Sequence, residues 1–189
     1  MLLSDRDIFQ AIEHGDITIR PYDRHLVQPA SIDVRLAADV RSFDRSAASL
    51  IDVKNIPEDY TVLNEVSHSH PYILHPGEFV LCSTVEHFGL ADNLVGRVEG
   101  KSSLGRLGLM IHSTAGFIDP GWDGVITLEL SNIGPLPITL YRDMPIGQIS
   151  FMQTLSPALR PYGHPDLGSR YYGQDRTTPS RYTLRDGQS

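Results

Sequence analysis

Residues 96–131 read GRVEGKSSLGRLGLMIHSTAGFIDPGWDGVITLELS, and the order of their glycines, hydroxyl residues and apolar runs sets the architecture of the chain. The last seven residues alternate apolar and polar side chains, which is typical of a strand with one buried face. Ile126, Leu128 and Leu130 would share the buried face, and Val125, Thr127, Glu129 and Ser131 the other.

Glu129 would therefore stand mid-strand between two hydroxyl residues, with an apolar row behind it. A carboxylate in a partly buried pocket can take up and release a proton during a reaction. A glutamate that faces solvent on an antiparallel sheet fits the same alternation and is common. The polar residues that precede Glu129 in the segment favour the first interpretation.

Residues 100–106, GKSSLGR, have the pattern of a phosphate cradle. A helical turn after the first glycine would point free backbone N–H groups at an anion in front of Ser102 and Ser103. Arg106 follows Ser102 by four residues, so the two would share one face of that turn. The lysine precedes the serines, so this is not a Walker A loop. A polar turn with a solvated Lys101 and Arg106 is the alternative.

Residues 114–121, TAGFIDPG, end in a tight turn. Proline presets its own φ, and the following glycine supplies the positive φ that the turn needs. Asp119 would lie at the mouth of the turn, where it is either a turn former or a functional carboxylate.

Outward from this segment the chain reads as short strands with Gly and Pro turns, which is typical of an all-β sandwich or barrel. Ser4 and Asp7 predict the start of one N-terminal helix, and Gly15 predicts its end. The region 39–70 lacks a clear period and predicts loops and short edge strands. The expected strands are residues 17–20, 31–36, 72–74, 79–88, 94–98, 125–131, 137–141 and 146–154.

Two polar pairs lie outside the central segment. Asp33 and Arg35 would share a strand face, where a structural ion pair is expected. His68 and His70 would lie on one side of an extended segment, but no third ligand is near in the sequence, so a surface loop is preferred to a metal site.

Composition limits the class of protein. The chain has 189 residues, 40% of them hydrophobic, which suits one domain, and a net charge of −7, which disfavours a nucleic-acid surface. Its single cysteine, Cys82, excludes an internal disulfide. No segment approaches ~18 consecutive apolar residues, so we expect no membrane association and a cytoplasmic location. Residues 156–189 are polar and rich in proline, which predicts a flexible C-terminal tail.

Five ordered blocks resemble the deoxycytidine triphosphate deaminase branch of the trimeric dUTPase superfamily, over nearly the whole chain. The resemblance implies a single domain over 1–189 with a distorted jelly-roll fold, assembly as a homotrimer, and a tail, 156–189, that closes over the active site. The blocks are SIDVRL (31–36), GKSSLGR (100–106), GFIDPGWDG (116–124), PIGQI (145–149) and GSRYYGQ (168–174).

The same resemblance implies that Glu129 activates a water that attacks C4 of cytosine, while Ser102, Arg106 and the carbonyl of Ala115 position that water. A zinc deaminase is excluded because the chain lacks the required cysteines. Position 170 is arginine where close relatives are expected to have lysine. The implied nucleotide contacts are Lys101, Ser102, Ser103, Leu104, Gly105, Arg106, Asp119, Thr127, Leu128, Glu129, Gln148, Tyr162, Arg170 and Gln174, with Arg176 as a further cation from the tail.

Gly116 and Phe117 resemble the bifunctional members, which continue from dUTP to dUMP, the precursor of dTMP. Glycine there leaves room for a second water at the α-phosphate, and Asp119 would help to hold that water. The resemblance also implies Mg²⁺ held mainly through the triphosphate, and inhibition by dTTP through Ser113 and Thr114. The alternatives are a deaminase that releases dUTP, a plain dUTPase, and a nucleotide-binding module without turnover.

Overall fold

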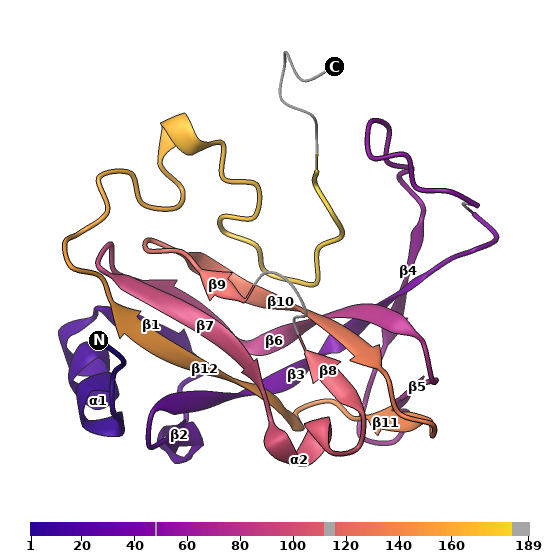
Figure 1. Cartoon of the computed structure of the whole chain (residues 1–189), viewed down its shortest axis with the longest axis horizontal. Coiled ribbons are helices and arrows are strands. Elements are labelled where there is room, and N and C mark those ends of the chain that lie inside the picture. The colour runs from indigo at the N-terminus through magenta and orange to yellow at the C-terminus, as the bar shows by residue number, and fades with distance from the viewer. Residues whose placement is uncertain (48, 112–115, 183–189) are drawn as a thin grey trace.

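The computed structural model describes residues 1–47, 49–111 and 116–182 of the chain. Short strands make up most of it, so the all-β prediction is confirmed (Figure 1). The helical elements are α1 (Asp5–His14), α2 (Ser102–Gly105), η1 (Arg24–Leu26) and η2 (Pro165–Leu167). The strands are β1 (Ile17–Arg20), β2 (Val27–Gln28), β3 (Ser31–Phe43), β4 (Thr61–Glu65), β5 (Tyr72–Leu74), β6 (Phe79–Leu90), β7 (Leu94–Gly100), β8 (Leu109–Ile111), β9 (Phe117–Ile118), β10 (Asp123–Asn132), β11 (Ile138–Leu140) and β12 (Pro145–Gln153).

Ten of the described strands form one antiparallel sheet, in the order β8-β10-β6-β3-β12-β7-β9, with β1 beside β6 and with β2 and β4 beside β3. Strands β5 and β11 form a separate pair. The large sheet curls into an open half-barrel, with the C-terminal segment above it and α2 below it in Figure 1. The two sides of the sheet therefore carry different parts of the predicted site.

Strand β10 follows the predicted alternation. Leu128 and Leu130 are fully buried, whereas Thr127 and Glu129 are only partly buried. Val125 departs from the pattern, since it is also buried. A register shift in the pairing of β10 with β6 falls between Val125 and Thr127, so the alternation restarts there.

Helix α1 has the predicted ends. Ser4 and Asp7 form a reciprocal capping box at its N-terminus, and Gly15 ends it with a left-handed φ of 81°. Ile8 and Ala11 are its buried residues. The local signals for this helix were therefore sufficient.

Two expectations for residues 31–70 are wrong. Strand β3 continues to Phe43, because β4 and β6 pair with its second half. The ion pair between Asp33 and Arg35 does not form. Arg35 bonds Glu86 instead, with 2.7 Å between Nε and Oε1. Asp33 accepts a hydrogen bond from Lys101. The two residues share a face, but each bonds a residue far away in sequence: Glu86 belongs to the neighbouring strand β6, and Lys101 follows β7.

His68 and His70 lie in the exposed loop between β4 and β5, as expected. His68 contacts Asp143, with 3.3 Å between Nε2 and Oδ2, and Nδ1 of His70 contacts the Ser69 hydroxyl at 3.0 Å. Neither contact indicates a metal site.

Candidate active site

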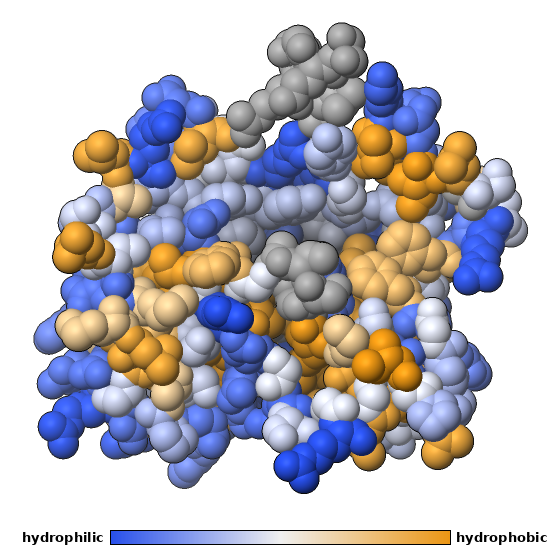
Figure 2. Space-filling model, in the orientation of Figure 1, coloured by the Kyte–Doolittle hydropathy of each residue, from blue (hydrophilic) through white to orange (hydrophobic). Residues whose placement is uncertain are grey.

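A cleft of about 610 Å³ opens between the sheet and the C-terminal segment, residues 156–182. Its walls come from β3, β6, β7, β9, β10 and the loop between β3 and β4 on one side. The C-terminal segment supplies the other side through Tyr162, Tyr171, Gln174, Thr178, Ser180 and Tyr182. Figure 2 shows hydrophobic side chains along both rims of this side of the molecule, in the C-terminal segment and in the loop between β3 and β4. The cleft is therefore an apolar hollow with a few polar groups inside, as ligand sites usually are.

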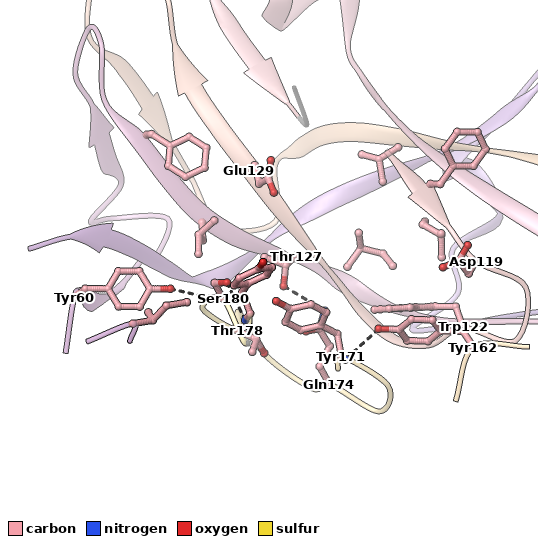
Figure 3. Close-up of a pocket in the computed structure, with 18 of the residues that line it drawn as sticks. Tyr60, Asp119, Trp122, Thr127, Glu129, Tyr162, Tyr171, Gln174, Thr178 and Ser180 are labelled. Atoms are coloured by element: carbon pink, nitrogen blue, oxygen red, sulfur yellow. Dashed lines mark hydrogen bonds between the residues drawn. The ribbon is translucent and has the colours of Figure 1, made fainter. Parts of the chain in front are cut away.

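Glu129 and Thr127 reach the cleft from β10 (Figure 3). They point away from the core because Leu128 and Leu130 take the opposite face of the strand. Figure 3 shows Glu129 on the sheet side of the hollow, across from Tyr171, Gln174 and Thr178. The strand thus places a carboxylate where a ligand between sheet and tail would meet it.

Asp119 lies at the end of the cleft, in the predicted turn. The backbone N–H of Trp122 donates to the Asp119 carbonyl at 3.1 Å, and Gly121 has a φ of +83°. The turn leaves Asp119 exposed while its neighbour Ile118 is buried. Its carboxylate is therefore available at the mouth of the cleft and does not serve only to form the turn.

Tyr162 closes the same end from the C-terminal segment. Its ring lies 5.2 Å from that of Trp122, and its hydroxyl accepts from the backbone N–H of Tyr171 at 3.1 Å. Burial, aided by the nearby charge of Asp119, raises the pKa of the Tyr162 phenol. The phenol thus stays protonated at neutral pH and can donate a hydrogen bond to an anionic ligand.

Gln174 is almost fully buried and fixes the C-terminal segment to β10. Its Nε2 donates to the Val125 carbonyl at 2.8 Å and to the Thr127 hydroxyl at 3.2 Å. Its Oε1 is buried and has no hydrogen-bond partner among the residues that the structure describes. An unpaired buried acceptor on the cleft wall is costly unless a ligand or water satisfies it.

Residues 101–106, which were predicted to bind phosphates, lie outside the cleft. The predicted helical turn is present as α2, and the Arg106 N–H donates to the Ser102 carbonyl at 3.1 Å. Ser102, Ser103, Gly105 and Arg106 are exposed. None of the described residues 101–106 lines the cleft, and neither does Gln148. The structure thus divides the predicted site into a cleft group, Asp119, Thr127, Glu129, Tyr162 and Gln174, and an α2 group, residues 101–106 with Gln148.

Lys101 and Gln148 support the base of α2. Lys101 Nζ donates to Asp33 Oδ2 at 2.6 Å. Gln148 accepts from the Ser31 hydroxyl at 2.9 Å and donates to the Gly100 carbonyl at 3.3 Å. These bonds hold the ends of three strands together where the chain leaves β7. Lys101 therefore forms a structural ion pair with Asp33, which the sequence did not predict.

The other predicted residues are placed as follows. Arg170 is not among the residues that line the cleft, and its guanidinium lies 5.3 Å from the ring centre of the cleft residue Tyr182. Leu128 contributes its side chain to the core, so only its backbone is near the cleft. Phe117 lines the cleft, and Gly116 accepts from the Val98 N–H at 2.8 Å beside it. Arg176 is exposed and contacts Asp175 at 3.6 Å. Ala115, Ser113 and Thr114 lie outside the described residues.

Sequence reasoning missed Trp122 and Tyr171 as cleft residues. Trp122 donates to the Gly124 carbonyl through Nε1 at 3.1 Å, and its ring packs against that of Tyr162 at a tilt of 35°. Both residues belong to blocks that the sequence singled out, GFIDPGWDG and GSRYYGQ. Aromatic residues beside functional blocks were the signal that could have found them.

Within the described residues, no group of three or more His, Cys, Asp or Glu side chains is arranged to hold a metal ion. Asp119 and Glu129 are the carboxylates that line the cleft. This donor set suits Mg²⁺ brought with phosphate oxygens, since Mg²⁺ keeps several waters and takes few protein ligands. No helix in the described part of the chain is long and apolar enough to cross a membrane.

Comparison with known proteins gives a family and close relatives. A family model described as dCTP deaminase-like matches residues 2–154. A protein of Corynebacterium jeikeium (strain K411) named "dCTP deaminase, dUMP-forming" is 57% identical over 184 residues, which cover 97% of this chain and 98% of its own. A protein of the same name from Corynebacterium glutamicum (strain R) is 55% identical over 184 residues, 97% of each chain.

A solved structure supports the fold. The crystal structure of 2'-deoxycytidine 5'-triphosphate deaminase from Agrobacterium tumefaciens aligns with a TM-score of 0.62 at 23% identity, over 79% of this chain and 46% of that one. At this identity the similarity concerns the fold alone.

Proposed function

The chain belongs to the dCTP deaminase-like family, and we propose that it is a dUMP-forming dCTP deaminase, which converts dCTP and two waters to dUMP, ammonia and pyrophosphate. The observation that carries the proposal is Glu129, a carboxylate on the wall of a cleft that the C-terminal segment covers. Relatives of that name, 55–57% identical over nearly the whole chain, support it. Both steps are hydrolyses, the first of a C–N bond and the second of a phosphoanhydride bond.

In the first step Glu129 would take a proton from water while the water oxygen bonds to C4 of cytosine. The same carboxyl would then give that proton to N4, which leaves as ammonia, and the proton of the new C4 hydroxyl would move to N3, so that C4 becomes the second carbonyl of uracil. Ser102, Arg106 and the carbonyl of Ala115 would hold the water and the tetrahedral intermediate. Both protons of the attacking water thus end on products, one on ammonia and one on N3 of uracil, and Glu129 carries the first of them.

In the second step a water would attack the α-phosphorus of dUTP, and pyrophosphate would leave. Asp119 stands exposed at the mouth of the cleft, where it can hold that water or the 3'-hydroxyl. Tyr162 can donate its phenol proton to a phosphate oxygen, and Arg170, from the same segment, supplies charge. Mg²⁺ would enter with the triphosphate and neutralise part of its charge.

One chain would not complete this site, because the α2 group lies outside the cleft. We therefore infer a homotrimer in which α2 of one subunit reaches the cleft of the next. An exposed apolar patch beside α2 supports this inference: Leu107, Ile133 and Leu136 are 61%, 69% and 72% exposed, and the Ile133 N–H donates to the Gly108 carbonyl at 2.9 Å. Such patches commonly mark interfaces.

Mixing two inactive variants tests the shared site. Chains with Glu129→Gln and chains with Arg106→Ala should each be inactive as pure trimers. Random mixing should restore on the order of a quarter of the sites, because each mixed ring contains one interface with both residues intact. Ammonia release from the co-expressed mixture measures this. A mixture of Ser102→Ala with Arg106→Ala is the matched control and should stay inactive, since both residues come from one α2. A site built within one chain would give no recovery in either mixture.

Gly116 and Phe117 are proposed to permit the second step. The double change Gly116→His, Phe117→Arg should keep ammonia release and slow pyrophosphate release at least about tenfold, because bulk and a cation would exclude the second water. Phe117 is 66% exposed, so its replacement disturbs no core packing. A Cβ at Gly116 would lie 3.3 Å from the Val98 carbonyl oxygen, a close contact that the backbone must relieve by a small shift, so the folding of the variant is checked by circular dichroism. Phe117→Leu alone is the control. Chromatography of dUTP and dUMP checks the result; loss of both activities together would argue against separate control of the second step.

The overall test is a time course with dCTP and Mg²⁺ that follows ammonia, dUTP, dUMP and pyrophosphate. Equal amounts of dUMP, pyrophosphate and ammonia, with little free dUTP, are expected. Accumulating dUTP would indicate a deaminase alone, and no ammonia would favour a dUTPase or a binding module. We also propose that dTTP inhibits the enzyme. A deamination rate that is unchanged by saturating dTTP would contradict this proposal.

A further inference from the structure

The C-terminal segment is fixed to the sheet at two separate places. The first anchor is on β10, where the Gly173 N–H donates to the Asp123 carbonyl at 2.8 Å and the Val125 N–H to the Gln174 carbonyl at 3.0 Å. The side chain of Gln174 adds the bonds described above. This anchor holds the block GSRYYGQ, which was expected to contact the nucleotide.

The second anchor lies on β3 and β4, beyond that block. Thr177 is 1% exposed, and its hydroxyl donates to the Asp39 carbonyl at 3.1 Å. Arg41 Nε donates to the Thr177 carbonyl at 3.0 Å. The Ser180 N–H donates to the Tyr60 hydroxyl at 2.9 Å (Figure 3).

Between the two anchors, residues 174–177 cover part of the cleft. Strands β10 and β3 flank β6 in the sheet, so residues 174–177 must cross β6. Two strand spacings are about 9.6 Å, and three residues span at most about 10 Å. The crossing is therefore nearly extended, and the strand register places it near Ser83 of β6, the partner of the cleft residue Thr127. Loss of hydrogen bonds at either anchor would let this segment move away from the cleft.

Arg41 is the central residue of the second anchor because it links β3, β4 and the C-terminal segment. It extends from β3, and besides the Thr177 carbonyl its Nη1 donates to the Thr61 hydroxyl of β4 at 3.3 Å. Among the described residues Arg41 does not line the cleft, so it has no direct place in the site. A guanidinium can hold both partners at fixed angles, which an ammonium cannot.

We propose that Arg41 is a positioning residue for the reaction: through Thr177 it holds the C-terminal segment closed, so that Tyr162, Arg170 and Gln174 meet the nucleotide. The functional part of this proposal rests on the proposed function. When the closed state is only partly populated, apparent affinity falls by that fraction. Saturating dCTP would close the segment by itself. Loss of Arg41 therefore raises KM and leaves kcat nearly unchanged.

The test compares Arg41→Gln, Arg41→Lys and Thr177→Val with wild type, using Arg97→Gln as a control. Thr177→Val removes the hydroxyl bond from the tail side, so the sheet stays intact even if Arg41 variants fold poorly. Arg97 is a strand arginine that pairs with Glu99 at 2.7 Å outside the cleft. The readouts are KM and kcat for dCTP, and the initial rate of trypsin cleavage after Arg176, identified by intact mass.

Arg41→Gln should raise KM and the cleavage rate on the order of tenfold, as expected for a lost hydrogen bond from a charged group, and kcat should stay within about twofold. Thr177→Val should act in the same direction, Arg41→Lys should recover part of the loss, and Arg97→Gln should change nothing. Unchanged cleavage and unchanged KM in both Arg41→Gln and Thr177→Val would overturn the proposal. If wild type released no ammonia, the proposed function would fail, and the cleavage rates alone would decide whether Arg41 holds the segment.

Discussion

Glu129→Gln is expected to lower kcat for deamination roughly a thousandfold, the middle of the range for loss of a general acid–base group. The amide has nearly the shape of the carboxyl but cannot take a proton from water. The Kd for dCTP should change little, because the remaining cleft group and the C-terminal segment stay in place. Single-turnover ammonia release and equilibrium binding of dCTP measure the two quantities separately.

Glu99→Gln is the matched control for this variant. Glu99 is a strand glutamate of β7 that pairs with Arg97 and does not line the cleft. It should retain the wild-type rate. A Glu129→Gln enzyme with full rate and normal binding would contradict the assignment of Glu129 as proton carrier.

Arg35→Met is expected to lower the free energy of unfolding by about 3–5 kcal/mol. The Glu86 carboxylate is 0% exposed. It accepts from Arg35 twice, at 2.9 Å from the backbone N–H and at 2.7 Å from Nε. Methionine fills similar space but leaves the buried carboxylate without its cation. The expected loss is the free-energy cost of leaving a charge buried without a partner. This cost is larger than the net contribution of the intact ion pair to stability.

Urea denaturation at one fixed protein concentration checks this value, because the stability of the proposed trimer would depend on concentration. Arg97→Met is the control: its pair with Glu99 has side chains 52% and 45% exposed, and should contribute about 0–1 kcal/mol. Equal losses in the two variants would show that burial of Glu86 is not what makes the Arg35 pair important.

Local patterns predicted the parts of the fold that depend on neighbours in sequence. The alternation around Glu129 gave its strand and its face, Ser4 and Gly15 gave the ends of α1, and Asp119 with Pro120 gave the turn. Each of these signals acts within a few residues, where steric and hydrogen-bonding preferences are nearly independent of the rest of the chain.

The errors concern contacts between distant residues. Arg35 pairs with Glu86 and Lys101 with Asp33, and both partners depend on strand order and register. The division of the site into a cleft group and an α2 group has the same origin. Composition also does not encode how residues 156–182 lie on the sheet, because backbone bonds at Gly173 and Gln174 and side-chain bonds of Gln174 and Thr177 to distant strands hold them there.

The contact between the rings of Trp122 and Tyr162 has a practical consequence. Trp122 is the single tryptophan of the chain, and its partner belongs to the C-terminal segment. Its ultraviolet emission therefore reports whether that segment is in place, with no added dye. Stopped-flow recording of this signal would time closure on dCTP separately from ammonia release, and would reveal which of the two events limits turnover.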